Sequence, residues 1–403
     1  MKRNHWLLAV ALPLLLLAGC GAKEPDPGAE APTPTPAIQI EEPQSQVLHS
    51  TDSRSYYTQN TRYDLETMTA RDWRPELPRG YQMTAEGPVS DGQALYFVLT
   101  RPGESSSKAL GRVPLEGGEV QILYECGEHE QIGIAYTDGA GEYYKRPILL
   151  RSGERRCFLV NRWGEEEEDS TWLYAWDSAS GTCEPVKRLG GHVRFWGEYQ
   201  GRAVLRDSWE PEAGLFQLDA ETGEMTVLLS SENAETSQFV LGPALLIREN
   251  FICVGSIFAQ NPDGKERVYC LDLETGAVRQ LASSDDGYLL VRVQDIWDGK
   301  LRVRGSEGYE SELWYVDCAT GQKVKGMLAD ESGTPMHIRA QIGEYYLIDV
   351  ESERWTKQLW INDQGEPVNS WVNQRRLALI AKEDYWAGRP DYQIFKWEGE
   401  QVP

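Results

Sequence analysis

The chain has 403 residues, a formal net charge of −23 and 40% hydrophobic residues. That apolar fraction is enough for a packed globular domain, whereas so strong a negative charge disfavours nucleic acids and anionic lipid surfaces as partners. The sequence therefore predicts a folded, acidic protein that binds no nucleic acid.

The first residues have the pattern of a leader. Met1-Lys-Arg3 precedes an apolar run from Trp6 to Ala18, which is too short to span a bilayer. The run ends in Leu17-Ala-Gly-Cys20, which resembles the lipobox of bacterial lipoproteins. The resemblance implies that residues 1–19 are a signal peptide and that Cys20 carries the lipid. We therefore expect a protein anchored in the cell membrane through its lipid, on the extracytoplasmic face.

Residues 20–45 follow as a candidate tether. This stretch is rich in small residues and proline, including Ala31-Pro-Thr-Pro-Thr-Pro36. Few of its side chains can bury apolar surface, so the composition predicts an extended, disordered segment. Residues 46–403 then form the folded domain.

One short pattern recurs along the folded domain: an alternating apolar strand, Asp-x-x-Thr-Gly or a close variant, and a second short strand. The pattern predicts a β-hairpin. The Asp side chain can accept hydrogen bonds from the amides that follow, and Gly can take the left-handed conformation that closes the turn. Turn chemistry alone explains these residues, so we predict a structural role for them. The clear copies are Asp177 to Gly181, Asp219 to Gly223, Asp272 to Gly276 and Asp317 to Gly321.

Weaker copies extend the series to seven hairpins, with turn glycines spaced by about 47 residues on average. Four-stranded blades of β-propellers occupy about 40–50 residues each. We therefore predict an all-β propeller of about seven four-stranded blades, with six or eight as alternatives. Residues 55–69 are predicted to be a further strand pair, which either closes the ring against the last repeat or adds an eighth blade.

Besides Cys20 the chain has six cysteines, and none stands in Cys-x-x-Cys spacing, so no zinc or thioredoxin-like signature is present. Several fall within strand patterns, where a free buried cysteine is common, and we expect them to be mostly unpaired. They are Cys126, Cys157, Cys183, Cys253, Cys270 and Cys318.

Three histidines stand near the starts of predicted innermost strands: His129, His192 and His337. Such starts gather around one mouth of a propeller channel, where three imidazoles could bind a metal. No His-Glu-x-x-His pattern accompanies them, and we predict no metal site. The acidic run from Glu165 to Asp169 lacks the alternating ligands of a calcium loop, and we predict a solvated loop there.

The chain contains 14 tryptophans. Those in the strand before each turn are expected to pack between blades. Others fall at strand ends or in loops, where exposed rings suit sugars, peptides or protein surfaces. The candidate aromatics of a ligand-binding face are Trp163, Trp209, Trp297, Trp355 and Trp386.

The repeated hairpins resemble the pyrroloquinoline-quinone-like repeats of β-propellers, from about residue 60 to the end. Those repeats usually place a Trp a few residues after the Gly, but Glu224–Leu228 and Ala277–Leu281 contain none. This departure argues against a quinone, and we predict no cofactor. A lipid-anchored propeller also resembles the BamB type of outer-membrane assembly lipoprotein, which is a non-catalytic scaffold.

No nucleophile elbow, P-loop or nucleotide fingerprint occurs, so no catalytic residue is assigned. The sequence favours a monomeric propeller that serves as a non-catalytic binding scaffold for a protein partner or an envelope polymer. The alternative is an extracytoplasmic enzyme that acts on a carbohydrate or small molecule at one propeller face. The missing motifs do not decide between them, because propeller active sites combine residues from different blades.

Overall fold

The computed structural model describes residues 45–398 with several internal gaps. The leader, Cys20 and the candidate tether therefore lie outside the described residues. Described residues all belong to the second of two compact units, residues 38–403. The gaps are residues 53, 59, 84–86, 105, 136–145, 165–168, 192, 208–213, 234–235, 242–243, 256–262, 288–289, 308–309, 351–354, 362–366 and 374–375.

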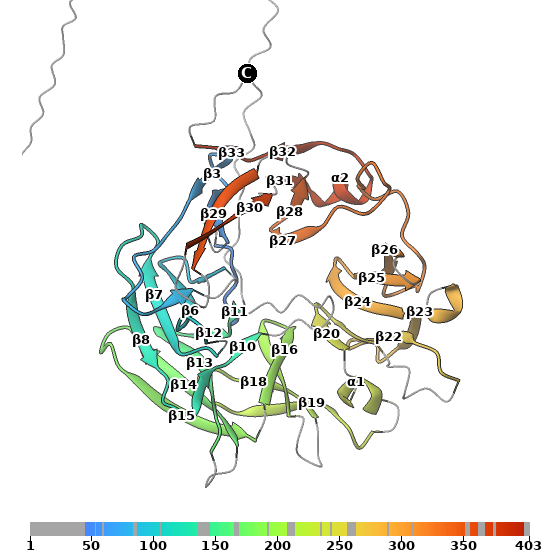
Figure 1. Ribbon diagram of the computed structural model, residues 1–403. Helices are drawn as coiled ribbons and strands as arrows, with labels where there is room; N and C mark the ends of the chain where they lie inside the picture. Colours follow the sequence, from blue (N-terminus) through green and yellow to red (C-terminus); the bar gives the residue numbers. More distant parts are fainter. Residues whose placement is uncertain are drawn as a thin grey trace, which may run out of the picture. The chain divides into compact units, whose positions relative to one another are not determined.

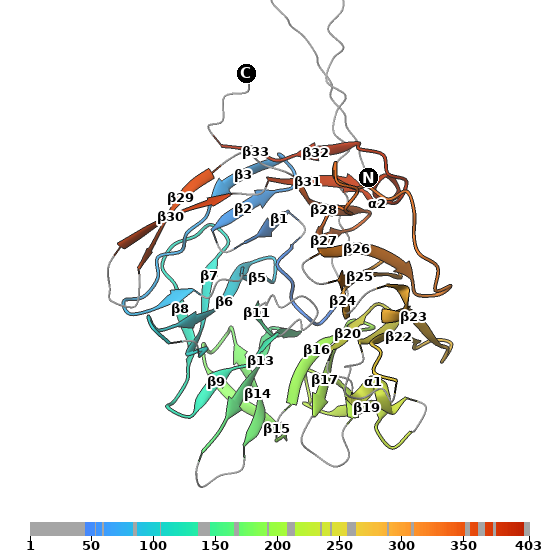
Figure 2. The same cartoon turned by 45° about the vertical axis from the view of Figure 1, so that its right-hand side comes forward.

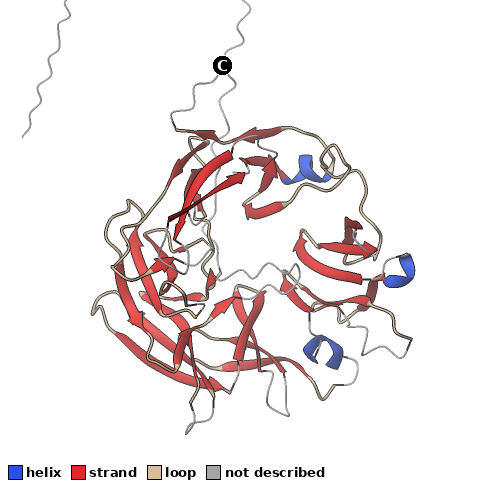
Figure 3. Ribbon diagram, viewed as in Figure 1, coloured by secondary structure: helices blue, strands red, loops and turns tan. Residues whose placement is uncertain are grey.

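The described part is an all-β fold in which small antiparallel sheets follow one another around a propeller-like ring (Figures 1 and 3). Described helical segments are short: α1 (Ser237–Leu241), a 3₁₀ turn (Ser284–Asp286) and α2 (Lys382–Trp386). The predicted all-β propeller class is thus confirmed.

The first three sheets come from the N-terminal part of the domain. The first contains β1 (Ser55–Tyr57), β2 (Thr61–Asp64), β3 (Thr69–Asp72) and β33 (Lys396–Trp397). The second contains β4 (Gln82–Met83), β5 (Val89–Ser90), β6 (Ala94–Thr100), β7 (Ala109–Pro114) and β8 (Gln121–Glu125). The third contains β9 (Glu130–Ile132), β12 (Leu149–Ser152), β13 (Arg155–Arg162), β14 (Ser170–Asp177) and β15 (Cys183–Gly190). A small pair, β10 (Ile134–Ala135) and β11 (Arg146–Pro147), lies between its strands in sequence.

An eight-stranded sheet follows, built from two antiparallel halves. One half is β16 (Val193–Tyr199), β17 (Arg202–Asp207), β18 (Gly214–Leu218) and β19 (Met225–Ser230). The other is β20 (Ala244–Arg248), β21 (Phe251–Gly255), β22 (Arg267–Asp272) and β23 (Val278–Ser283). A single parallel register between Gly197 and Ile247 joins β16 to β20 and hence the two halves.

The C-terminal sheets complete the ring. A three-stranded sheet holds β24 (Leu290–Trp297), β25 (Lys300–Glu307) and β26 (Glu310–Asp317). The next holds β27 (Ile338–Ile342), β28 (Tyr345–Val350), β31 (Arg376–Ala381) and β32 (Tyr392–Ile394), and a separate hairpin of β29 (Trp355–Ile361) and β30 (Pro367–Asn373) lies between β28 and β31 in sequence.

The two ends of the domain meet in the first sheet. β33 pairs in parallel with β3 through Thr69–Lys396 and Ala70–Trp397, and the two strands lie side by side in Figures 1 and 2. The predicted strand pair at residues 55–69 therefore exists and joins the last repeat. Residues 392–397 of the last repeat form two strands in two different sheets, since β32 pairs with β31 and β33 pairs with β3.

The Asp turns have the same geometry in each copy. The Gly181 amide donates to the Asp177 carbonyl over 2.9 Å, and the amides of Ala179 and Ser180 donate to Asp177 Oδ1. Asp219 and Asp272 repeat these bonds, Asp317 accepts from the Thr320 amide in the same way, and all four glycines have φ near +70°. Asp64 builds a further copy in the first sheet, where Met68 at φ 52° takes the place of glycine.

Gly276 offers the cleanest test of the turn, because its φ is 70° and no atom would lie within 4 Å of an added Cβ. Gly276→Val should lower the free energy of unfolding by about 1–3 kcal/mol through backbone strain alone. Gly276→Asn is the matched control and should lose less, since Asn tolerates the left-handed region. Equal thermal melting temperatures for wild type and Gly276→Val would show that the turn does not require glycine.

Because neighbouring strands are antiparallel, each sheet has two ends at which its strands are connected. The Asp turns and the tight turns between first and second strands lie at one, which we call the turn edge. The second strands end and the third strands begin at the other, which we call the loop edge.

Apolar clusters fill the space between neighbouring sheets. One of them joins Leu150 and Leu173 of the third sheet to Leu205 and Leu218 of the next. Trp176, Trp314 and Trp397 are buried, as expected for rings before the turns. The side chain of Trp360 lies outside the described residues.

Residues 46–49, which precede β1, form hydrogen bonds with three different sheets. The Gln46 amide donates to the Gly201 carbonyl over 2.7 Å, and the Leu48 amide donates to the Leu149 carbonyl over 2.9 Å. The Ser90 amide donates to the His49 carbonyl over 2.7 Å, and His49 Nε2 lies 3.1 Å from Glu198 Oε2. This entry segment is thereby tied to β12, β5 and the β16–β17 hairpin.

Candidate functional site

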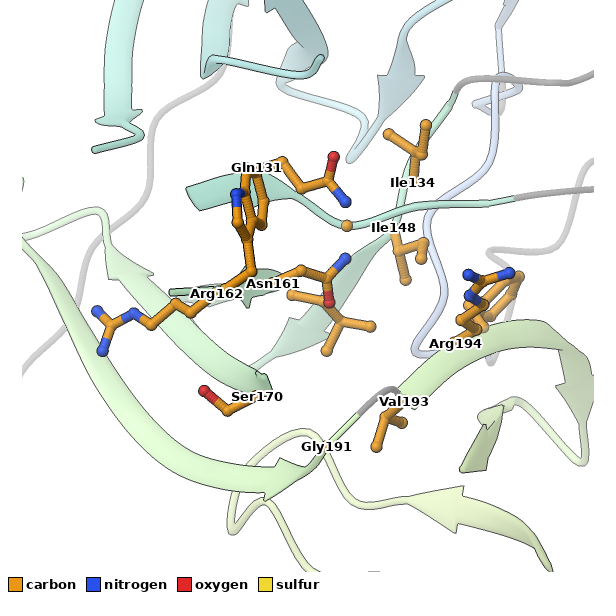
Figure 4. Close-up of a pocket in the computed structure, with 13 residues that line it drawn as sticks. Gln131, Ile134, Ile148, Asn161, Arg162, Ser170, Gly191, Val193 and Arg194 are labelled. Atoms are coloured by element: carbon orange, nitrogen blue, oxygen red, sulfur yellow. The ribbon is translucent and has the colours of Figure 1, made fainter. Parts of the chain in front are cut away.

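A small pocket lies at the loop edge, between the third sheet and β16 (Figure 4). β13 ends there, β14 and β16 begin there, and β9 pairs with the end of β13. The pocket is lined by Gln131, Gly133, Ile134, Ile148, Leu159, Asn161, Arg162, Trp163, Ser170, Gly191, Val193, Arg194 and Phe195.

Gly133 permits the close approach of two chain segments at the base of the pocket. A Cβ at this position would lie 2.6 Å from the Leu159 Cβ, far inside contact distance. The Gly133 amide donates to the Leu159 carbonyl over 2.7 Å, so the segment after β9 is held directly against β13. Any side chain at residue 133 would push the two walls apart.

Two carboxamides face the hollow. In Figure 4 the side chains of Gln131 and Asn161 extend in the same direction, towards Ile134 and Ile148. The Thr171 hydroxyl donates to Asn161 Oδ1 over 3.0 Å and accepts from the Val193 amide over 3.1 Å. These bonds fix the Asn161 oxygen and turn its amide nitrogen to the opposite side, where it can donate to a ligand.

Arg162 braces the rim rather than filling the hollow, and Figure 4 shows its side chain extending away from the other lining groups. Its Nε donates to Glu130 Oε1 over 2.8 Å, and its guanidinium lies 5.2 Å from the Trp172 ring centre. Burial tends to raise the pKa of Glu130. Hydrogen bonds from the Gly127 amide and Tyr124, with the Arg162 charge, outweigh burial and hold that pKa below its usual value.

A second basic element lies across the pocket on β16 and β17. Arg194 is exposed and directly opposite Arg206 in the strand register. Burial and the Arg194 charge lower the pKa of Arg206, whose guanidinium lies 5.4 Å from the Trp196 ring centre. The pocket is thus bordered by guanidinium groups in a chain that is strongly acidic overall.

The candidate tryptophans do not gather at one place. Trp163 is half-buried and lines the pocket. Trp297 is 2% exposed in a core cluster with the Arg248 guanidinium 3.5 Å from its ring centre, so it is not a surface aromatic. Trp386 donates from Nε1 to Asp298 Oδ2 over 3.1 Å at the turn edge. Trp209 lies outside the described residues, as does the side chain of Trp355.

The described candidate histidines, His129 and His337, do not lie together either. His129 is exposed, and its carbonyl accepts from the Trp163 amide over 3.0 Å. His337 Nδ1 lies 3.2 Å from Asp349 Oδ2, and Arg339 donates to both oxygens of Asp349. His192 and residues 165–168 of the acidic run lie outside the described residues. His129 and His337 share no cluster of possible metal ligands within the described part.

Sequence reasoning did not single out Gln131, Asn161 or Arg194. These residues belong to no motif, and they meet because β9, β13 and β16 adjoin in the ring. The only local signal was the aromatic and polar composition of Arg162-Trp163 at the end of a predicted strand.

No family model and no curated protein matches the sequence. Among solved structures, the chain is similar to TolB from Acinetobacter baumannii, with 13% identity, a TM-score of 0.33, and coverage of 75% of this chain and 63% of TolB. It is also similar to oligogalacturonate lyase from Vibrio parahaemolyticus, with 14% identity, a TM-score of 0.40, and coverage of 79% and 88%.

The chain is also similar to a prolyl endopeptidase, with 11% identity and a TM-score of 0.41. The match covers 78% of this chain but only 49% of the prolyl endopeptidase, so this chain spans about half the length of that enzyme. These likenesses concern the β-propeller fold alone. In the described residues, no helix is long and apolar enough to cross a membrane.

Proposed function

We propose that this chain is an extracytoplasmic lipoprotein whose propeller is a non-catalytic binding scaffold for a protein partner or an envelope polymer. The proposal includes the lipid on Cys20 and the assignment of the hairpins to the pyrroloquinoline-quinone-like repeats. It also includes seven blades, counted by taking the two halves of the eight-stranded sheet separately and leaving out the small pairs β10–β11 and β29–β30.

The observation that carries the proposal is the chemistry of the loop-edge pocket. Its described lining combines amide groups, guanidinium groups and an indole, and none of these lining residues is Asp, Glu, His or Cys. Such a set can hydrogen-bond and stack against a ligand but supplies no acid or base near neutral pH. We therefore assign binding to the pocket.

Site-directed photo-crosslinking in the native cell tests this assignment. A benzophenone amino acid at Gln131 should capture the bound partner or polymer, whereas the same group at Ala179, in an exposed turn of the same sheet, should not. In the protein that carries the benzophenone at residue 131, Trp163→Ala should reduce capture about thirtyfold, as expected for a contact residue that contributes about 2 kcal/mol to the binding free energy.

Two results would reject the scaffold assignment. Equal adducts from Gln131 and Ala179 would mean that the pocket is not the contact site. Turnover of a glycan panel by the purified chain, lost on substitution of residues at one propeller face, would establish the enzyme alternative.

The lipid anchor is tested separately. Cys20→Ser should move the protein from the membrane fraction to the soluble extracytoplasmic fraction, because the acylated sulfur is removed while residues 46–403 are unchanged. Cys126→Ser serves as the control for cysteine loss and should stay with the membrane. Retention of Cys20→Ser in the membrane fraction would contradict the lipid anchor.

A further inference from the structure

Three cysteine thiols converge between two neighbouring sheets. Cys253 of β21 and Cys270 of β22 are directly opposite in the strand register, and Cys318 follows the last residue of β26. Their Sγ atoms all lie within 4.8 Å of one another, and none of the three residues is more than 1% exposed. Within the described residues this is the one group of three such side chains close enough to share an ion.

The other described cysteines behave differently. Cys157 donates its thiol to the Ala220 carbonyl, and Cys183 donates its thiol to the Leu123 carbonyl. Cys126 is also a free, buried thiol. The convergence of three sulfurs is therefore specific to one place in the ring and is not a general result of cysteine-rich strands.

The geometry fits a three-coordinate ion. Three bonds of about 2.3 Å hold the sulfurs about 4 Å apart when the ion lies in their plane, and about 3.5 Å apart when an ion with a lone pair lies at the apex of a pyramid. The thiols need to approach by at most about 1.3 Å to reach either separation. Since all three ligands are sulfur, the site selects a soft ion over a hard one.

The surroundings constrain the charge of the complex. Apolar side chains, including Val268, Leu301 and Val316, pack around the thiols. Asp272 stands two residues after Cys270, and Asp317 directly precedes Cys318, so the nearest charged residues in the sequence are acidic. A buried net negative charge beside them would be costly. Three thiolates with a monovalent or divalent ion keep a negative charge, whereas three thiolates with a trivalent ion are neutral.

We propose that Cys253, Cys270 and Cys318 form a three-thiolate site for a trivalent thiophilic metalloid of the arsenite class. Arsenous acid reacts with three thiols: three As–O and three S–H bonds break, three As–S bonds form, and three water molecules leave. The oxidation state of arsenic does not change and no net proton is released. Because the thiols are buried, the ion enters during folding or when the neighbouring sheets separate locally.

The test uses the purified full chain, refolded in a reductant with or without sodium arsenite as the only added ligand. One arsenic per chain should remain after gel filtration. The intact mass should rise by one arsenic less three hydrogens, and the melting temperature should rise because only the folded state brings all three sulfurs together around the ion.

Cys253→Ser and Cys318→Ser should each lose the bound arsenic, and Cys157→Ser should retain it. If a serine variant does not refold, the corresponding alanine variant replaces it. The proposal is overturned if refolded wild type retains no arsenic, or if Cys318→Ser retains as much as wild type. It is also overturned if the chain purified without reductant has a disulfide between two of the three cysteines.

Discussion

Gly197→Ala should lower the free energy of unfolding of the domain by about 3 kcal/mol, because the added methyl group has no room. A Cβ at Gly197 would lie 2.3 Å from the Ile247 carbonyl oxygen and 2.8 Å from the Ile247 Cβ. Both obstacles belong to β20, whose backbone is fixed by its antiparallel pairing with β21. The added methyl can therefore be accommodated only by moving the two strands apart.

The position matters because Gly197 and Ile247 form the single register between the two halves of the eight-stranded sheet. The loss of stability should be measurable by urea denaturation. Gly127→Ala is the matched control: its nearest contact would be the flexible Glu130 side chain at 3.6 Å, and its stability should hardly change. Indistinguishable denaturation midpoints for the two variants would contradict the close packing of β16 on β20.

Asp349→Asn should lower the free energy of unfolding by about 2 kcal/mol at neutral pH, because hydrogen bonds to charged groups are worth about 1.5–3 kcal/mol. Asp349 has a side chain 8% exposed and accepts from Arg339 Nε over 2.8 and 2.9 Å. The substitution leaves the Arg339 and His337 side chains beside a neutral amide. Asp263→Asn, in an exposed pair with Arg267, is the control and should change stability little.

The same residue sets a pH dependence. Burial tends to raise the pKa of Asp349, but hydrogen bonds from His337 and Arg339 and their charges hold it well below the usual range. A depressed folded-state pKa contributes stability that is present above the unfolded value of about 4 and is lost as the pH falls below it. The stability difference between wild type and Asp349→Asn should therefore shrink between pH 4 and acid unfolding. A difference that stays constant over that range would rule out this ion pair as its source.

Local chemistry was the part of the fold that the sequence could predict. Asp177-x-x-Ser-Gly181 and its copies need only neighbouring atoms to form their turns, so a short pattern suffices. The division of residues 392–397 between two sheets was not predictable in this way, because β33 pairs with a strand more than 300 residues earlier. Met68 shows a related limit, since it has the turn conformation without the expected glycine.

The candidate site was less predictable than the fold for the same reason. Trp163 and Trp297 look alike as aromatic residues at strand ends, yet one lines a pocket and the other is in the core. Which of them is exposed depends on the neighbouring sheet, which periodicity does not report. Cys253, Cys270 and Cys318 come from two repeats and adjoin only after the sheets have packed.

The entry segment also has a mechanical consequence. If Cys20 holds the chain to a membrane, drag on the ring is transmitted through Gln46 before it reaches any sheet. There the load is shared, because residues 46–49 are bonded to Gly201, Leu149 and Ser90 of three different sheets. A pulling force at the N-terminus therefore acts on several hydrogen bonds before it reaches β1 and the sheet that contains the β3–β33 pair.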